Sequence, residues 1–291
     1  MIDLHSHSTA SDGADHPREL IQLAYSKGVR TLALTDHDTL TGLDEAAEEA
    51  KKLSLLFLYG VEIEINASRG VFHLLGLNLD PSNAKGMQQL QTALEDQQRK
   101  RENRNQEIVQ TLNHLGLFCD YDEIRALASD VVGRVHIARY LFQKGYVKSQ
   151  QMAFDKYLAT GRPAFIRKES FDLEQAVTLI HQAGGKAIVA HPLSLYQSWR
   201  GLEESFHTFE ALGVDGLEAY HSNCKVGESR RLVELAKKFD WIVTGGSDYH
   251  GAKYLSRKLG YATAGEKIDS ALLEPLLRED QRMLWHRIQQ Q

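Results

Sequence analysis

The chain has 291 residues, of which 42% are hydrophobic, so it can form one large α/β domain or a domain with a sizeable insertion. Its formal charge of −5 gives no general basis for binding nucleic acid or a membrane surface. Cys119 and Cys224, the two cysteines, form no CxxC pattern, which argues against a disulfide framework or a zinc ribbon. No apolar run approaches the ~20 residues of a membrane span. The motif-like first residues do not fit a signal peptide, so we expect a cytoplasmic protein.

Short apolar segments alternate with amphipathic helical patterns in both the first and the last third of the chain. This alternation predicts βα units around a mainly parallel sheet, with residues 70–79 as one strand of a hairpin. The expected strands are residues 2–5, 31–38, 55–65, 70–79, 186–192, 216–221 and 241–250. The expected helices between them are residues 16–28, 43–53, 173–185, 204–213 and 228–239.

The pattern changes to mainly helix from about residue 87 to residue 157. We therefore predict a barrel-like α/β domain made of residues 1–86 and 165–291, interrupted by a helical insertion, residues 87–164. Charge divides in a similar way. Residues 96–168 carry 13 basic and 8 acidic side chains, against 21 and 31 in the remainder. An acidic barrel can hold cations and a basic insertion can meet an anion, although solvated helix surfaces would give the same division.

Histidines and carboxylates collect where the expected strands end. In βα barrels the C-terminal ends of the strands converge on one face, where active sites form. His5 and His7 point to the same side of a strand because they are two residues apart, and so do Asp248 and His250. The full set is His5, His7, Asp36, His37, Asp38, Glu62, Glu64, His73, His191, Asp248 and His250.

This mixture of imidazoles and carboxylates indicates a metal centre. A single histidine at a strand end is more often a hydrogen-bonded structural residue, but five of the 13 histidines stand at such ends beside acidic residues. The donor types suit Zn²⁺, Mn²⁺ or Fe²⁺ better than Ca²⁺. The candidates outnumber the ligands of one ion, so we expect two or three divalent ions. Such ions activate water and clamp phosphate, so no nucleophilic side chain is needed.

The motifs DLHSHS, TDHD, GVEIE, AHP and GSDYH occur in this order between residues 3 and 250. Their combination resembles the PHP (polymerase and histidinol phosphatase) family of metal-dependent phosphoesterases. The resemblance implies a distorted (β/α)7 barrel with up to three metal ions. Carried over position by position, it assigns one ion to His5, His7, Glu62 and Asp248, a second to Glu62, His73 and His191, and a third to Asp12, His37 and His250.

Asp12 departs from the pattern, since many members of the family have a histidine there. A carboxylate is a harder ligand, which favours Mn²⁺ or Fe²⁺ over Zn²⁺ at this position. We expect Mn²⁺, with Zn²⁺ or Fe²⁺ as alternatives. Asp3, Asp36 and Asp38 are expected to orient imidazoles, although each could equally cap a loop.

Substrate contacts are expected mainly from the insertion. Arg134 and His136 stand at the start of a predicted helix, where anions are favoured, and an arginine binds phosphate through a bidentate fork. Arg167 follows the insertion and could line the mouth of the barrel, although a solvated charge is an alternative. His221 ends another strand and could contact the substrate or the leaving group, or serve only a structural role.

The short first motif, the helical insertion and the GRVHIARYL segment resemble a bacterial subgroup of the family. This subgroup contains nucleoside 3′,5′-bisphosphate phosphatases and RNase AM-type 5′→3′ exoribonucleases. The resemblance implies a cap domain that recognises a 5′-phosphorylated nucleotide or short RNA end, with Glu62, His191, Asp248 and Arg134 in catalysis. The alternatives are another phosphomonoesterase, such as a histidinol phosphatase, an amidohydrolase, or an inactive metal-binding module. We expect no membrane contact and no obligate protein partner.

Overall fold

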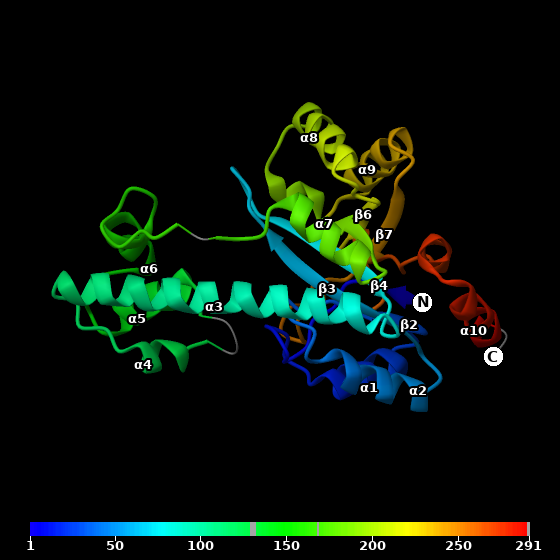
Figure 1. Ribbon diagram of the computed structural model, residues 1–291, viewed down its shortest axis with the longest axis horizontal. Helices are drawn as coiled ribbons and strands as arrows, with labels where there is room; N and C mark the ends of the chain where they lie inside the picture. The colour runs from blue at the N-terminus through cyan, green and yellow to red at the C-terminus, as the bar shows by residue number, and fades with distance from the viewer. Residues whose placement is uncertain (129–131, 168, 290–291) are drawn as a thin grey trace. The chain divides into compact units, whose positions relative to one another are not determined.

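The computed structural model describes residues 1–128, 132–167 and 169–289. The chain forms two compact units, one made of Met1–Leu94 and Phe171–Gln291 and the other of Glu95–Ser170 (Figure 1). The division expected at residues 86/87 and 164/165 stays a prediction. The helix α3, Ala84–His114, continues without a break across the first of these positions and from one compact unit into the other.

The first unit contains a seven-stranded sheet in which each strand neighbours the next in the chain. Beyond β1 and β7, a parallel bridge joins Ser6 to Tyr249, and the Leu4 N–H donates to the Gly245 carbonyl. These contacts bring the two edges together, so the predicted seven-stranded barrel is confirmed. The strands are β1 (Ile2–Asp3), β2 (Thr31–Leu34), β3 (Leu56–Ile65), β4 (Phe72–Leu79), β5 (Lys186–Val189), β6 (Gly216–His221) and β7 (Ile242–Gly246).

The strand β4 runs antiparallel to both of its neighbours, β3 and β5. The other adjacent pairs of the sheet are parallel. The hairpin expected at residues 70–79 is therefore confirmed, with Glu64 opposite His73. Because its direction is reversed, β4 begins at the end of the barrel where the parallel strands finish. His73, near the start of β4, thereby joins residues that follow the other strands.

Helices pack on the outer face of the barrel, where they cover apolar strand residues. Their ends follow local chemistry: Pro17 opens α1 with its restricted φ, and the Asp172 carboxylate caps α7 by accepting from the Gln175 N–H at 2.8 Å. The helices of this unit are α1 (Pro17–Ser26), α2 (Leu43–Lys52), the N-terminal part of α3, α7 (Leu173–Gln182), α8 (Trp199–Ala211), α9 (Val226–Lys238) and α10 (Glu279–Gln289).

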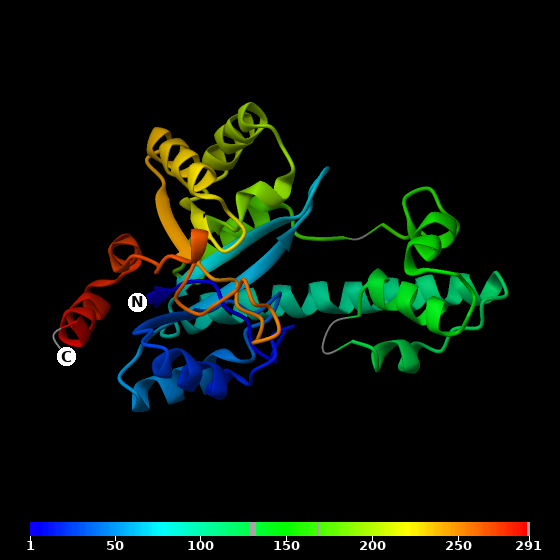
Figure 2. The same ribbon diagram turned by 180° about the vertical axis from the view of Figure 1, so that it is seen from behind.

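A second apolar cluster fills the inside of the barrel below the strand ends. Leu58, Leu75 and Ile188 from three strands pack there against Leu273 and Trp285 from the last part of the chain. Figure 2 shows this C-terminal segment, with α10, close to the N-terminus. Because the lower interior is closed by side chains, the barrel has room for a cavity at the opposite end.

The second unit is helical, as predicted, and has its own core. Its helices are the C-terminal part of α3, α4 (Tyr121–Arg125), α5 (Arg134–Gln143), α6 (Gln150–Ala153) and a π-helical turn, Phe154–Leu158. Ile108 and Leu112 of α3 pack with Ile137 and Leu141 of α5, and all four side chains are buried. Among the described residues, no helix is both long and apolar enough to cross a membrane.

Candidate metal centre

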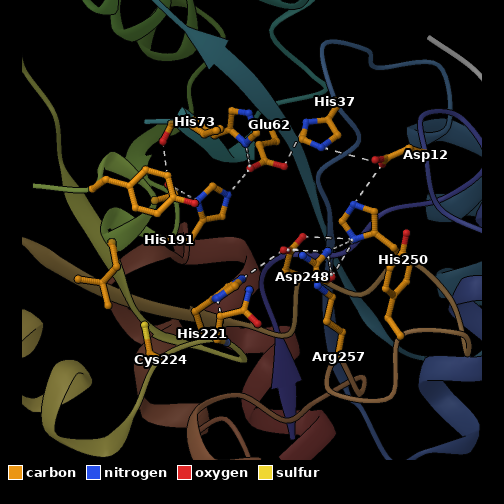
Figure 3. Close-up of a pocket in the computed structure, with 16 residues that line it drawn as sticks. Asp12, His37, Glu62, His73, His191, His221, Cys224, Asp248, His250 and Arg257 are labelled. Carbon is orange, nitrogen blue, oxygen red and sulfur yellow. Dashed lines mark hydrogen bonds and ion pairs between the residues drawn. The ribbon is translucent and has the colours of Figure 1, made fainter. Parts of the chain in front are cut away.

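The imidazoles and carboxylates singled out in the sequence meet at one end of the barrel (Figure 3). They line a cavity of about 570 Å³ whose described lining belongs to the first unit. His37 and Glu62 face each other across a parallel bridge between the end of β2 and β3. The members that line the cavity are Asp12, His37, Glu62, His73, His191, His221, Asp248 and His250.

Three overlapping groups of these side chains have donor atoms close enough to share a cation. In each group all of the donor atoms lie within 4.8 Å of one another. One group is identical to the first ligand set that the family resemblance implies. A second group contains the third implied set together with His7. The remaining group contains Glu62 and His73 of the second implied set together with His37. The groups are His5, His7, Glu62 and Asp248; His7, Asp12, His37 and His250; and His37, Glu62 and His73.

Glu62 is the common member of the cluster. Its Oε1 lies 2.7 Å from His73 Nδ1 and 2.9 Å from His191 Nε2. Its Oε2 lies 3.2 Å from the nearest ring nitrogen of each of the three other imidazoles, namely those of His5, His7 and His37. A carboxylate placed in this way can bridge two cations, because each oxygen faces a different set of ligands.

Buried ring nitrogens without hydrogen bonds support a cation at this place. His5 and His7 are fully buried, yet His5 Nε2 and both ring nitrogens of His7 make no hydrogen bond. Asp248 Oδ1 lies 3.5 Å from His5 Nε2 and 3.3 Å from His7 Nε2. A buried polar atom without a hydrogen bond lowers the stability of the fold. A metal ion bound by these ring nitrogens and the nearby carboxylates therefore explains the arrangement better than an empty space.

The pKa values reflect this crowding. Burial lowers the pKa of His7, but the neighbouring carboxylates of Asp248 and Glu62 outweigh burial and raise its pKa to about 9. Burial raises the pKa of Glu62, yet the surrounding imidazoles hold it well below its usual range. At His37, burial dominates and lowers the pKa to about 4. Without a cation, protons on imidazoles therefore neutralise the carboxylates, and a divalent cation has to displace them.

Two cluster residues stand at strained backbone positions. His191 has a φ of 28° and Asp248 a φ of 53°, and non-glycine residues rarely adopt positive φ. Such strain persists where the surrounding structure enforces it, commonly at functional sites. Gly246, the last residue of β7 and two residues before Asp248, is constrained sterically: a Cβ there would collide with His5 and with Glu218.

Glu218 is a member of the site that the sequence reasoning missed. It is completely buried on β6, where its Oε1 accepts from His5 Nδ1 at 3.1 Å and its Oε2 accepts the His191 backbone N–H at 2.9 Å. The first bond fixes the His5 tautomer and leaves Nε2 for a cation. The sequence signal was available, because Glu218 is a carboxylate in the middle of an apolar strand.

Asp3 and Asp36 bind the backbone and hydroxyl groups instead of orienting imidazoles. Asp36 accepts from both the N–H and the hydroxyl of Ser8 and from the hydroxyl of Ser11, so it holds the loop that carries Asp12. Asp3 accepts from Ser247 and Gly260 in the same way. The loop-capping alternative therefore describes both residues. Asp38 accepts the Glu64 backbone N–H at 3.2 Å.

The group of His7, Asp12, His37 and His250 includes the least buried ligand candidate, Asp12. Its side chain is half exposed, and its Oδ1 lies 3.2 Å from His250 Nε2, 3.8 Å from His7 Nδ1 and 3.9 Å from His37 Nε2. These imidazoles, above all His250, overcome burial and lower the pKa of Asp12. The carboxylate is therefore ionised and available to a cation.

His221 also lies inside the cluster. Its Nδ1 accepts from the Asn223 backbone N–H at 3.2 Å, which leaves the proton on Nε2. Nε2 then donates to Asp248 Oδ2 at 3.2 Å. His221 thus lines the cavity and contacts a ligand candidate, to which it donates its ring N–H.

Two of the three substrate candidates, Arg134 and His136, make contacts within the second unit. Arg134 begins α5 as predicted, donates to the Leu158 carbonyl at 3.1 Å and lies over the Phe165 ring. His136 Nδ1 accepts from the Gly133 N–H at 3.0 Å, so this ring caps the helix. Arg167 is exposed.

Comparison with known proteins identifies the class. A PHP domain model matches residues 3–171, more than half of the chain. The chain is 41% identical over 248 residues to a 5′-3′ exoribonuclease of Haemophilus influenzae, covering 85% of this chain and 89% of that protein. It is 33% identical over 263 residues to a 3′,5′-nucleoside bisphosphate phosphatase of Chromobacterium violaceum, covering 89% and 90%. The chain therefore belongs to the PHP family and is a hydrolase of phosphate esters.

Solved structures have the same fold. A Chromobacterium violaceum protein described as an amidohydrolase, with bound sulfate and no metal, has a TM-score of 0.73 and 31% identity. The match covers 98% of this chain and 96% of that protein. A proposed metal-dependent phosphoesterase from Bifidobacterium adolescentis has a TM-score of 0.70 and 28% identity, with 94% of each chain covered.

Proposed function

We propose that the chain hydrolyses a phosphate ester of nucleotides with the help of divalent cations. The substrates are nucleoside 3′,5′-bisphosphates, which lose the 3′-phosphate, or short 5′-phosphorylated RNA, which is cleaved in the 5′→3′ direction, or both. The observation that carries this proposal is the set of imidazoles around Glu62, at 2.7–3.2 Å, in an open cavity at the strand ends. The relatives that act on a nucleotide and on RNA support the choice of substrate.

We assign the cations to the ligand sets that the family implies. His5, His7, Glu62 and Asp248 hold one ion, Glu62 with His73 and His191 a second, and Asp12, His37 and His250 a third. The half-exposed Asp12 carboxylate favours Mn²⁺ over Zn²⁺ in its set, with Fe²⁺ as the alternative. When bound, these ions supply charge neutralisation at the phosphate and lower the pKa of a water molecule.

Residues of the chain itself perform the remaining tasks. Glu218 keeps His5 in the tautomer that exposes Nε2, and Asp36 holds the loop that carries Asp12. His221 lines the cavity beside Asp248 and is our candidate contact to the substrate or the leaving group. Arg134, with His136 and Arg167, binds the other phosphate of the substrate, because the insertion has an excess of basic residues.

In the amidohydrolase alternative, a carboxylated lysine on a strand would bridge two metal ions. Among the described residues that line the cavity there is no lysine, and Glu62 occupies the bridging place. The relatives named for activity on a nucleotide and on RNA favour a nucleotide substrate over histidinol phosphate. We propose a cytoplasmic location and no obligate protein partner.

A side-by-side assay tests the proposal. Adenosine 3′,5′-bisphosphate, adenosine monophosphates, 5′-phosphorylated oligoribonucleotides and histidinol phosphate are each incubated with the Mn²⁺-supplemented protein. We expect release of phosphate from the bisphosphate, or of mononucleotides from the RNA, at rates well above those with histidinol phosphate. Preferential turnover of histidinol phosphate, or turnover of none of the four, would contradict the proposal.

A further inference from the structure

Arg257 stands at the wall of the cavity although no motif includes it. Among the described residues that line the cavity it is the only arginine or lysine, whereas the carboxylates there are Asp12, Glu62 and Asp248. About a quarter of its side chain is exposed. A cavity that takes a phosphate ester would therefore have one fixed organic cation next to its metal ligands.

Contacts from two sides hold the guanidinium in place. Its Nη1 lies 3.1 Å from Asp248 Oδ2 and 3.2 Å from the Asp248 carbonyl oxygen, and its carbon lies 5.4 Å from the centre of the Tyr254 ring. Figure 3 shows Arg257 directed at Asp248. The hydrogen bonds to described residues all use Nη1, and a guanidinium has five N–H donors. The donors on Nε and Nη2 are thus free for a ligand.

His250 is a second neighbour of Nη1. Its Nδ1 lies 2.8 Å from Arg257 Nη1 and 2.8 Å from the Asp248 carbonyl oxygen. The ring nitrogen can accept from the first or donate to the second, but it cannot do both. The guanidinium therefore lies against two members of the candidate metal centre, Asp248 and His250, so an anion bound there is within its reach.

We propose that Arg257 binds the phosphoryl group that is cleaved. The proposal rests on the proposed function, which places a phosphate against the Asp248 ligand set. Because Arg257 contacts Asp248 directly, a phosphate held by cations on that carboxylate is within reach of the guanidinium. The charge-assisted N–H···O bonds add affinity for the phosphate, and the planar fork sets its orientation. Arg257 therefore serves every substrate, whereas Arg134 serves only those with a second phosphate.

Direct binding of inorganic phosphate tests this role without turnover. Calorimetry gives the Kd of phosphate and of Mn²⁺ for the full-length protein and for Arg257→Ala and Arg257→Lys. We expect Arg257→Ala to raise the Kd of phosphate about 10- to 100-fold, since it removes hydrogen bonds to a charged group. Arg257→Lys keeps the charge but loses the fork, so its Kd should fall in between. The Kd of Mn²⁺ should be unchanged or lower, because a cation has been removed.

Arg30→Ala is the matched control. Arg30 lies 4.5 Å over the Tyr25 ring and Arg257 lies 5.4 Å over the Tyr254 ring, but Arg30 is not part of the cavity lining. This variant should bind phosphate like the wild type. If Arg257→Ala leaves the Kd of phosphate unchanged, or raises the Kd of Mn²⁺, the inference is wrong. Arg257 would then only hold Asp248 in position. A wild type that binds phosphate but cleaves no nucleotide would refute the proposed function alone.

Discussion

The central charged candidate residues of the barrel are buried, whereas those of the helical second unit are partly or fully exposed. His5, His7 and Glu62 are at most 1% exposed, and their donor atoms contact one another. Arg134 is only partly buried, and Arg167 is exposed. Buried, mutually dependent groups have few alternative arrangements, whereas exposed cations act one by one in water. Changes in the barrel cluster should therefore abolish activity, and changes in the insertion should alter affinity for particular substrates.

Loss of a ligand candidate in the barrel should have the largest effect. Asp248→Ala or His191→Ala removes a partner of the cluster, and we expect activity to fall about 1,000-fold or more, because bound metal supplies several kcal/mol of transition-state stabilisation. Circular dichroism should show a folded barrel. Asp215→Asn is a suitable control, since Asp215 contacts His181 at 2.7 Å outside the cavity. Wild-type-like turnover of Asp248→Ala or His191→Ala in a metal-stripped assay would refute the metal mechanism.

Glu218 tests whether orientation of ligands matters as well as their presence. Glu218→Gln keeps the shape but changes the partner of His5 Nδ1, and we expect metal affinity to fall about 10- to 100-fold. Glu218→Ala should weaken it further, because the His191 N–H also loses its acceptor. The Kd of Mn²⁺ checks both variants. If both bind Mn²⁺ like the wild type, Glu218 has no positioning role.

The pH dependence of metal binding tests the buried character of the cluster. The His7 pKa of about 9 means that a cation displaces a proton below that pH. For each proton released, affinity should rise up to tenfold per pH unit between pH 7 and pH 9. The metal-free fold gains stability from this raised pKa below the ordinary value of 6.5 and loses that gain as the pH rises through about 9. Calorimetry in buffers of different ionisation enthalpy counts the protons, and a count of zero contradicts the account.

In the insertion, Arg134→Ala should have the smallest and most selective effect. We expect KM for a nucleoside 3′,5′-bisphosphate to rise about tenfold, since a charge-assisted hydrogen bond is lost. KM for a simple aryl phosphate should hardly change. Steady-state kinetics with both substrates decides the matter, because equal effects on both would exclude Arg134 as the contact to the second phosphate.

Much of the barrel could be predicted because its residues carry local signals. Strand periodicity located the seven strands, and the two-residue spacing of His5 and His7 predicted that they face the same space. Because strand ends converge in a βα barrel, His37, Glu62 and His191 could be assigned to one site from the sequence alone. The reversed strand β4 placed His73 with them, and the hairpin pattern around residue 75 had indicated that reversal.

What the sequence could not provide were contacts between distant residues without a motif. Glu218 and Arg257 lie 213 and 252 positions from His5, and only folding brings them to the cluster. Asp36 could orient a ring or cap a loop from its sequence position alone, and the choice depended on where the hydroxyls of Ser8 and Ser11 lie. Local pattern predicts which residues stand at strand ends, but not which hydrogen bonds they share.

Removal and return of metal tests the central claim most directly. The full-length wild type and Asp248→Asn are treated with chelator, dialysed and assayed on adenosine 3′,5′-bisphosphate and on 5′-phosphorylated RNA, with and without added Mn²⁺. We predict that the chelated wild type is inactive, that Mn²⁺ restores it, and that Asp248→Asn stays inactive in both conditions. Undiminished turnover by the chelated wild type would contradict a cation-dependent site at the end of the barrel.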